Sequence, residues 1–291
     1  MNSLFSWEIK TANINDDLYP EILKKIPDPP KILYFRGKLL ENETCLGIVG
    51  TRRASDYGKE IAFSIARDLA EAGLTIVSGM ARGIDTMAHK GALEAGGRTI
   101  AVLGTGLDEK SIYPQENLKL AKKILKSGGC LISEYPPGTR GTNFTFPQRN
   151  RIISGISLGV LVVEAKLKSG ALITANWAKK QERKVFAVPG PLHSKNSQGP
   201  HFLIKKEAKL VENADDILAE LNLPKLSKKP IIGETVEKNL ILKVLEEGNL
   251  TIDKIVEKTN LSLQIVSATL SLMEIEGKVK SLGGNVYALS R

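Results

Sequence analysis

The sequence predicts an α/β protein with a doubly wound, mostly parallel sheet, followed by a small winged helix-turn-helix domain. Between residues 45 and 224, short apolar runs of strand length alternate with helical patterns, which is typical of a parallel sheet covered by helices. After residue 234, three helical patterns precede a short segment with a Gly-Gly turn, and this is the element order of a winged helix. We therefore expect a large domain and a small one.

Residues 1–44 are expected to form a strap along the large domain. The segment contains prolines at four positions and has no sustained periodicity. A short helix is predicted near residues 19–25, and the partial alternation of KILYFRG, residues 31–37, favours an edge strand.

Six strands and six helices are predicted over residues 45–224. The strands cover residues 46–50, 74–79, 98–104, 130–134, 159–165 and 184–190. The helices begin near Gly58, Ile84, Gln115, Gly170, Gly199 and Ala214. Parallel strands joined by helices end at one edge of the sheet, so a ligand is expected at that edge.

Residues 225–234 are rich in lysine and poor in periodicity, which predicts a linker, and residues 235–291 carry the winged-helix pattern. The third helix of that pattern, residues 262–276, has no lysine or arginine and carries Glu274 and Glu276. Phosphate contacts supply most non-specific affinity for DNA, so this helix is a poor reader of duplex DNA. A protein-interaction or regulatory module is favoured.

The net charge of +9 points to an anionic partner. Residues 45–224 contain 25 Lys+Arg against 17 Asp+Glu, so almost all of the excess lies in the large domain. The N-terminus does not resemble a signal peptide, and no apolar run approaches the roughly 18 residues of a membrane span. A cytoplasmic protein without a membrane partner is expected.

The stretch from Phe146 to Thr174 has the features of an anion site. Arg149 and Arg151 flank Asn150, which gives many side-chain donors and one acceptor. A buried strand follows, and then Ser169 and Gly170 precede a helical pattern, whose N-terminus favours anions. Ion pairing of the two arginines with Glu134 and Glu164 is an alternative that the sequence leaves open.

Two other loops at the same edge are candidates for phosphate contacts. GTRRASDYG places Arg52, Arg53 and Ser55 in a tight loop before a helix. SGMARGID offers the small residues Ser78 and Gly79 for close backbone approach. Lys166, after the fifth strand, is either a further contact or part of a solvated face.

The residue patterns also argue against several function classes. Asp85 and His89 lie one helical turn apart, but a structural, hydrogen-bonded pair at a helix start is favoured over acid-base catalysis. There is no phosphate-binding nucleotide loop and no Gly-x-Gly-x-x-Gly, so neither an enzyme nor a cofactor is expected. Cys45 and Cys130 open buried strands and are interpreted as small hydrophobic groups. With no CxxC pair and no metal-ligand spacing of histidines, no metal site is expected.

Several motifs, taken in order, resemble one family. GTRRASDYG, SGMARGIDTMAH, TIAVLGTGLD with YPQEN, LISEYPPG, FPQRNRIISG, VVEAKLKSGALITANWA and VFAVPG are similar to the DNA-processing protein A family, also called Smf. The similarity covers roughly residues 20–221. A helical module that is common at the N-terminus of the family is shortened or absent here, because about twenty residues precede Pro20.

The resemblance implies a Rossmann-like domain that binds single-stranded DNA, a homodimer, and loading of the recombinase RecA on DNA taken up in natural transformation. It implies that Arg52 binds DNA, as do Ser169, Gly170, Ala171 and Leu172. Ala171 stands where the family usually has a hydroxyl residue. Two other functions stay open: a Rossmann-like enzyme that processes nucleotides, and a duplex-binding regulator that uses the winged helix.

Overall fold

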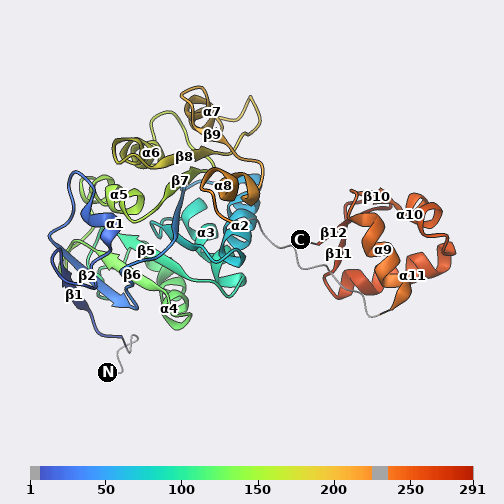
Figure 1. The fold of residues 1–291 in the computed structure, drawn as a ribbon, viewed down its shortest axis with the longest axis horizontal. Coiled ribbons are helices and arrows are strands. Elements are labelled where there is room, and N and C mark those ends of the chain that lie inside the picture. Colours follow the sequence, from blue (N-terminus) through green and yellow to red (C-terminus); the bar gives the residue numbers. More distant parts are fainter. Residues whose placement is uncertain (1–6, 225–234, 291) are drawn as a thin grey trace. The chain divides into compact units, whose positions relative to one another are not determined.

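The computed structural model describes residues 7–224 and 235–290, and the chain divides into two compact units, Met1–Leu226 and Ser227–Arg291 (Figure 1). The linker predicted at residues 225–234 lies outside the described residues. None of the helices among the described residues has the length and apolar character that crossing a membrane requires.

The first unit is built on a nine-stranded sheet in the order β1-β2-β6-β5-β4-β3-β7-β8-β9. Its strands are β1 (Lys10–Asn13), β2 (Ile32–Gly37), β3 (Cys45–Val49), β4 (Thr75–Ser78), β5 (Thr99–Leu103), β6 (Cys130–Ser133), β7 (Gly159–Val162), β8 (Lys184–Ala187) and β9 (Lys209–Leu210). Strands β3 to β9 pair with one another in parallel. Strand β2 pairs antiparallel with both β1 and β6. Strand β3 lies between β4 and β7, so the strand order reverses there, and such a switch point is where ligands bind in open α/β sheets.

The six predicted strands are present as β3 to β8, each ending earlier than the apolar run suggested. Cys45 and Cys130 open β3 and β6 and are buried free thiols, and burial raises the pKa of Cys130 to about 12. The prediction of an edge strand at residues 31–37 is wrong, because β2 lies between β1 and β6. Residues 10–13 take the edge position instead.

Helices cover both faces of this sheet, as Figure 1 shows. They are α1 (Glu21–Lys24), α2 (Asp56–Glu71), α3 (Ile84–Glu94), the 3-10 helix η1 (Gln115–Asn117), α4 (Leu118–Lys126), α5 (Thr145–Gly155), α6 (Gly170–Lys180), α7 (Gln198–Ile204) and α8 (Ala214–Glu220). One apolar core packs α5 and α6 on the sheet through residues such as Ile152 and Ala175, and another packs α2 and α3 through Ile65 and Ala88. Both faces of the strands are therefore buried.

The segment FPQRNR, which carries Arg149 and Arg151, lies in helix α5. Pro147 is the third residue of this helix, where a missing backbone N–H costs no intrahelical hydrogen bond. Ile152 and Ile153 are fully buried, and they anchor the helix to the sheet. The apolar residues behind the polar segment therefore determine its conformation.

The second unit is a winged helix, as predicted. It consists of α9 (Val236–Leu245), β10 (Leu250–Thr251), α10 (Ile252–Thr259), α11 (Leu263–Ile275), β11 (Val279–Ser281) and β12 (Val286–Leu289), with the strands in the order β10-β12-β11. The side chains of Thr235, Thr251 and Ser262 accept hydrogen bonds at the starts of the three helices. Apolar residues of all three helices form a separate core.

Candidate nucleic-acid interface

A cavity of about 850 Å³ opens at the carboxyl end of β3, beside the point where the strand order reverses. Its walls come from five segments far apart in the sequence. They are residues 49–52 at the end of β3 and just after it, Ala81 and Asp85 around the start of α3, and parts of the segments 110–115 after β5, 140–153 before and within α5, and 169–174 at the start of α6. The sheet edge expected to bind a ligand therefore carries a concave site.

Four cationic side chains and a single carboxylate line this cavity. The cations are Arg52, Lys110, Arg140 and Arg149, and the carboxylate is that of Asp85. Arg52, Lys110 and Arg140 are exposed, and none of them forms an ion pair with another described residue. The cavity therefore has a strongly positive lining with hydrogen-bond donors that are open to solvent.

Two aromatic rings line the cavity together with Arg52. The Arg52 guanidinium lies over the ring of Phe146, with Cζ 5.4 Å from the ring centre. The rings of Phe146 and Tyr113 are tilted against each other with their centres 5.6 Å apart, and the Tyr113 side chain is about half exposed. Cations beside accessible aromatic rings are typical of sites that hold a phosphate and an unstacked base together.

The turn that carries Arg52 is held by Glu164, at the end of the neighbouring strand β7. The Glu164 carboxylate accepts hydrogen bonds from the Ser55 backbone N–H at 2.9 Å and from the Ser55 hydroxyl at 2.5 Å. The Thr51 N–H donates to the Glu164 carbonyl oxygen at 2.7 Å. Ser55 Oγ also accepts from the Gly58 N–H and caps α2. Ser55, a predicted DNA contact, therefore positions the turn and does not line the cavity.

Arg149 reaches the cavity from a buried position. Its Nη1 donates to the carbonyl oxygens of Gly79, at 2.8 Å, and Val102, and its Nε donates to Asn150 Oδ1. Burial lowers the pKa of Arg149 to about 10, and the neighbouring charge of Asp85 opposes this shift. Arg149 therefore stays charged at neutral pH and adds positive potential to the cavity. Its Nη1 group, however, is engaged by backbone carbonyl oxygens at the ends of β4 and β5.

Asp85 and His89, the predicted structural pair, bond to different partners. Asp85 Oδ2 accepts from the Ala81 N–H at 3.3 Å and fixes the loop before α3, whereas His89 Nδ1 lies 2.7 Å from the Thr99 hydroxyl. Burial raises the pKa of Asp85 to about 6, partly offset by the charge of Arg149. Burial and the same arginine lower the pKa of His89 to about 3. The histidine is therefore neutral at physiological pH, and its role is to pack and to bond to Thr99.

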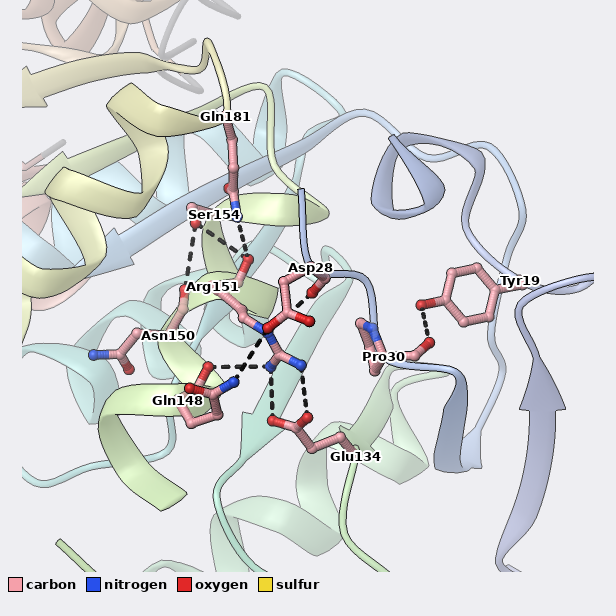
Figure 2. Close-up of polar contacts among 9 residues, drawn as sticks. All are labelled: Tyr19, Asp28, Pro30, Glu134, Gln148, Asn150, Arg151, Ser154 and Gln181. Atoms are coloured by element: carbon pink, nitrogen blue, oxygen red, sulfur yellow. Dashed lines mark hydrogen bonds and ion pairs between the residues drawn. The ribbon is translucent and has the colours of Figure 1, made fainter. Parts of the chain in front are cut away.

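Arg151 was predicted to contact DNA, and the structure contradicts this (Figure 2). Its side chain is 3% exposed and donates twice to the Glu134 carboxylate, from Nη1 and Nη2, at 2.7 Å each. Its Nε donates to the carboxylate and the carbonyl oxygen of Asp28, and Nη1 also donates to the Gln148 carbonyl oxygen. The alternative of pairing with Glu134 is therefore confirmed for Arg151, whereas Glu164 binds Ser55.

Three further candidates are buried and do not line the 850 Å³ cavity. Ser78 is fully buried and donates to the Ile48 carbonyl oxygen at 2.6 Å, and Leu172 packs in the core. Gly79 is buried as well, and a Cβ there would come within 2.7 Å of both Arg149 Nη2 and Asp85 Oδ2. The absence of a side chain at Gly79 thus leaves room for these two charged side chains, and Gly79 itself lines a smaller adjoining cavity.

The remaining predicted residues lie at or near the cavity. Ser169, Gly170 and Ala171 line it at the N-terminus of α6, and the Ser169 hydroxyl has no hydrogen-bond partner among the described residues. A Cβ on Gly170 would meet one atom, at 4.0 Å. Arg53 lines a smaller adjoining cavity of about 180 Å³, and Lys166 is exposed but lines neither cavity.

Sequence reasoning missed Lys110, Arg140 and Tyr113. They belong to the loops GTGLDEKSIYP and EYPPGTRG, which follow the third and fourth predicted strands. Their position after strands of the same sheet was the available signal, because the ends of parallel strands converge. Which side chains of a long loop face the cavity depends on the loop's path, and that path has no periodic pattern.

Comparison with known proteins assigns both units. Residues 10–222 match the family described as DNA recombination-mediator protein A, and residues 227–285 match the DprA winged helix domain. The chain is 46% identical over 215 residues to the DNA processing protein DprA of Bacillus subtilis, covering 73% of this chain and 71% of that protein. It is 38% identical over 314 residues to Protein Smf of Synechocystis, covering 94% and 78%.

Two solved structures are also similar. DprA of Streptococcus pneumoniae superimposes with a TM-score of 0.69 at 44% identity, covering 73% of this chain and 74% of that one. DNA processing protein A of Helicobacter pylori, whose structure is described as giving insight into its single-stranded DNA binding mode, superimposes with a TM-score of 0.66 at 32% identity, covering 76% and 98%. The chain therefore belongs to the DNA recombination-mediator protein A family, whose members are named DprA or Smf.

Proposed function

We propose that this chain binds single-stranded DNA in the cavity at the carboxyl end of β3 and acts in the cytoplasm as a recombination mediator. The observation that carries the proposal is the cavity lining of four cations against one carboxylate, together with the rings of Phe146 and Tyr113. Phosphates would contact Arg52, Lys110, Arg140 and the free N–H groups at the start of α6. A base would stack on the exposed ring of Tyr113.

A single strand suits this site better than a duplex does. In a duplex the bases are stacked and paired, so their faces are not open to aromatic side chains. A concave site that combines phosphate donors with ring faces therefore gains most from an unpaired strand. The structure of the Helicobacter pylori relative, described as concerning single-stranded DNA binding, supports the same choice.

The test compares Arg52→Ala with Lys90→Ala in binding to single-stranded and duplex oligonucleotides at two salt concentrations. Lys90 is an exposed lysine on α3 that lines neither cavity, so its removal changes the net charge equally. We expect Arg52→Ala to weaken binding and to lower the salt slope by about 0.7 for one lost phosphate contact. Equal behaviour of the two variants would remove Arg52 from the site, and preference of the wild type for duplex DNA would contradict the proposal.

We further propose that the chain works as a homodimer that loads RecA on DNA entering the cell in natural transformation. Membership of the recombination-mediator family supports this role. Light scattering would give the oligomeric state, and RecA filament growth on strands coated with single-strand-binding protein would measure loading. A wild-type protein that binds DNA and leaves filament growth unchanged would contradict the loading step alone.

A second candidate is an enzyme that processes free nucleotides, because the Asp85 carboxyl lines the cavity with a pKa of about 6. A raised pKa of this kind is typical of general acids and bases. Turnover of a nucleotide panel that Asp85→Asn abolishes would favour this function. Arg149 and the Ala81 N–H account for the position of Asp85 without catalysis, so DNA binding is preferred.

The winged helix is proposed to bind protein and not duplex DNA. Helix α11, the groove-reading helix of such domains, contains no lysine or arginine, and it exposes the apolar side chains of Leu263, Ile265, Leu272 and Ile275. Because this unit has its own core, residues 235–291 can be tested as a fragment. Tight binding of duplex DNA by the fragment would support the regulator function instead.

A further inference from the structure

The outer face of helix α6 continues from the cavity toward the opposite end of the helix. Gly170 and Thr174 line the cavity. Gly170, Ile173, Trp177 and Lys180 follow one another at spacings of three and four residues, so they form one stripe. Gly170, Ile173 and Lys180 are exposed and Trp177 is half-buried. The helix has 11 residues, so this stripe leads about 16 Å away from the cavity.

An aromatic ring and a cation are paired at the far end of this stripe. Lys180 Nζ lies over the Trp177 ring, 5.1 Å from its centre. Such a contact is worth only about 0.5–1 kcal/mol at an exposed site, so a nucleobase can displace the lysine from the ring face. A stacked base is worth about 1–3 kcal/mol, and the displaced lysine would remain close enough for a phosphate.

More cations lie near the C-terminal end of α6. Lys179 Nζ donates to the Lys206 carbonyl oxygen at 2.7 Å, which brings the end of α6 next to the segment after α7. That segment contains Lys205, Lys206 and Lys209, all exposed. In the described part of the chain, no ion pair involves Lys180, Lys205 or Lys206. Glu182 and Glu207 are the acids nearest in sequence, and the cations outnumber them.

We propose that single-stranded DNA leaves the cavity along α6, stacks a base on Trp177 and contacts phosphate-binding lysines at Lys180 and Lys205–Lys206. The proposal rests on the single-stranded DNA binding proposed above and extends its site. An acidic peptide would also be attracted to the lysines, but it has no planar group for the Trp177 ring. The continuity of the stripe with the cavity likewise favours one strand that occupies both.

The intrinsic fluorescence of Trp177 provides the test. The chain has two tryptophans, Trp7 and Trp177, so Trp7→Phe leaves Trp177 as the reporter. This variant is titrated with a short oligothymidylate that fills only the cavity and with a longer one. We expect the longer strand to quench Trp177 and the shorter strand to leave its emission unchanged, because only the longer one reaches the ring.

Affinity measurements accompany the titration. Trp177→Ala should weaken binding of the longer strand about tenfold, and Trp177→Phe should restore most of the loss because it keeps a ring. Lys180→Ala, which alters an exposed side chain and leaves the fold intact, should lower the salt slope by about 0.7 for the longer strand only. None of these substitutions should change binding of the shorter strand.

Each contrary outcome has a distinct meaning. In one outcome both strands bind and Arg52→Ala abolishes this binding, but the Trp177 emission and the affinity of Lys180→Ala are unchanged. That outcome would overturn the proposed path of DNA along α6 and leave the cavity as the whole site. No binding at either length would overturn both proposals. Quenching by an acidic peptide such as oligoglutamate, but not by the longer strand, would assign the surface to a protein partner.

Discussion

Replacement of Arg151 by methionine tests whether this arginine braces the fold or contacts DNA. Arg151 is almost fully buried and donates to Glu134, Asp28 and the Gln148 carbonyl oxygen. Methionine keeps much of the side-chain volume but leaves the Glu134 carboxylate, 15% exposed, without its cation. Breaking a buried ion pair from one side typically costs about 3–5 kcal/mol.

Most of this cost belongs to Glu134. The Asp28 side chain is 58% exposed, so water can replace Arg151 there and this pair contributes little. For a unit of this size, about 2–4 °C of melting temperature is lost per kcal/mol, so we expect Arg151→Met to lower the melting temperature by about 10 °C. Against a typical domain stability of about 5–15 kcal/mol, the variant remains folded at room temperature.

The assay combines thermal unfolding with oligonucleotide binding at a temperature where the variant is folded. The matched control is Arg52→Ala, which removes an exposed arginine and should weaken binding without lowering the melting temperature. The double variant Arg151→Met/Glu134→Leu should recover much of the lost stability, because no buried charge is left unpaired. Our reasoning would be refuted by an Arg151→Met protein of wild-type stability that binds single-stranded DNA weakly.

Three further predictions concern the groups around the cavity and the N-terminal strap. Asp85 has a folded-state pKa of about 6 against 3.8. The stability it contributes is therefore present below pH 4 and lost as the pH rises to about 6, by about 3 kcal/mol in all. The free energy of unfolding by denaturant, measured for Asp85→Asn and for the wild type, should therefore differ by an amount that changes with pH over this range. His89, with a pKa lowered to about 3, changes stability in the opposite direction, but it does so in both proteins. A difference that is independent of pH would contradict the assignment. Gly83 has φ +74°, and a Cβ added there would lie 2.3 Å from the Thr51 carbonyl oxygen. Gly83→Ala should therefore displace the turn that carries Arg52 and lower both the thermal stability and the affinity for DNA. Unchanged values would show that the turn adapts. Tyr19→Phe removes the 2.7 Å hydrogen bond to the Pro30 carbonyl oxygen and should cost about 1–3 kcal/mol in denaturant unfolding, with unchanged DNA affinity.

The sequence by itself determined the sheet and the winged helix. Each of β3 to β8 is a short apolar run between helical patterns, and its identity depends on residues that are neighbours in the chain. The same holds for the helix starts at Thr251 and Ser262, whose caps bond to N–H groups three residues later. The sequence also indicated Arg52 and the start of α6, which both line the cavity.

The tertiary structure alone decided which cations face the ligand. Arg149 and Arg151 are two residues apart, yet one reaches the cavity and the other is enclosed by Asp28 and Glu134. Lys110 and Arg140 join Arg52 only because the ends of β3, β5 and β6 meet at one edge. The burial of a charge depends on partners that other segments supply, and the local pattern of a sequence contains no record of those partners.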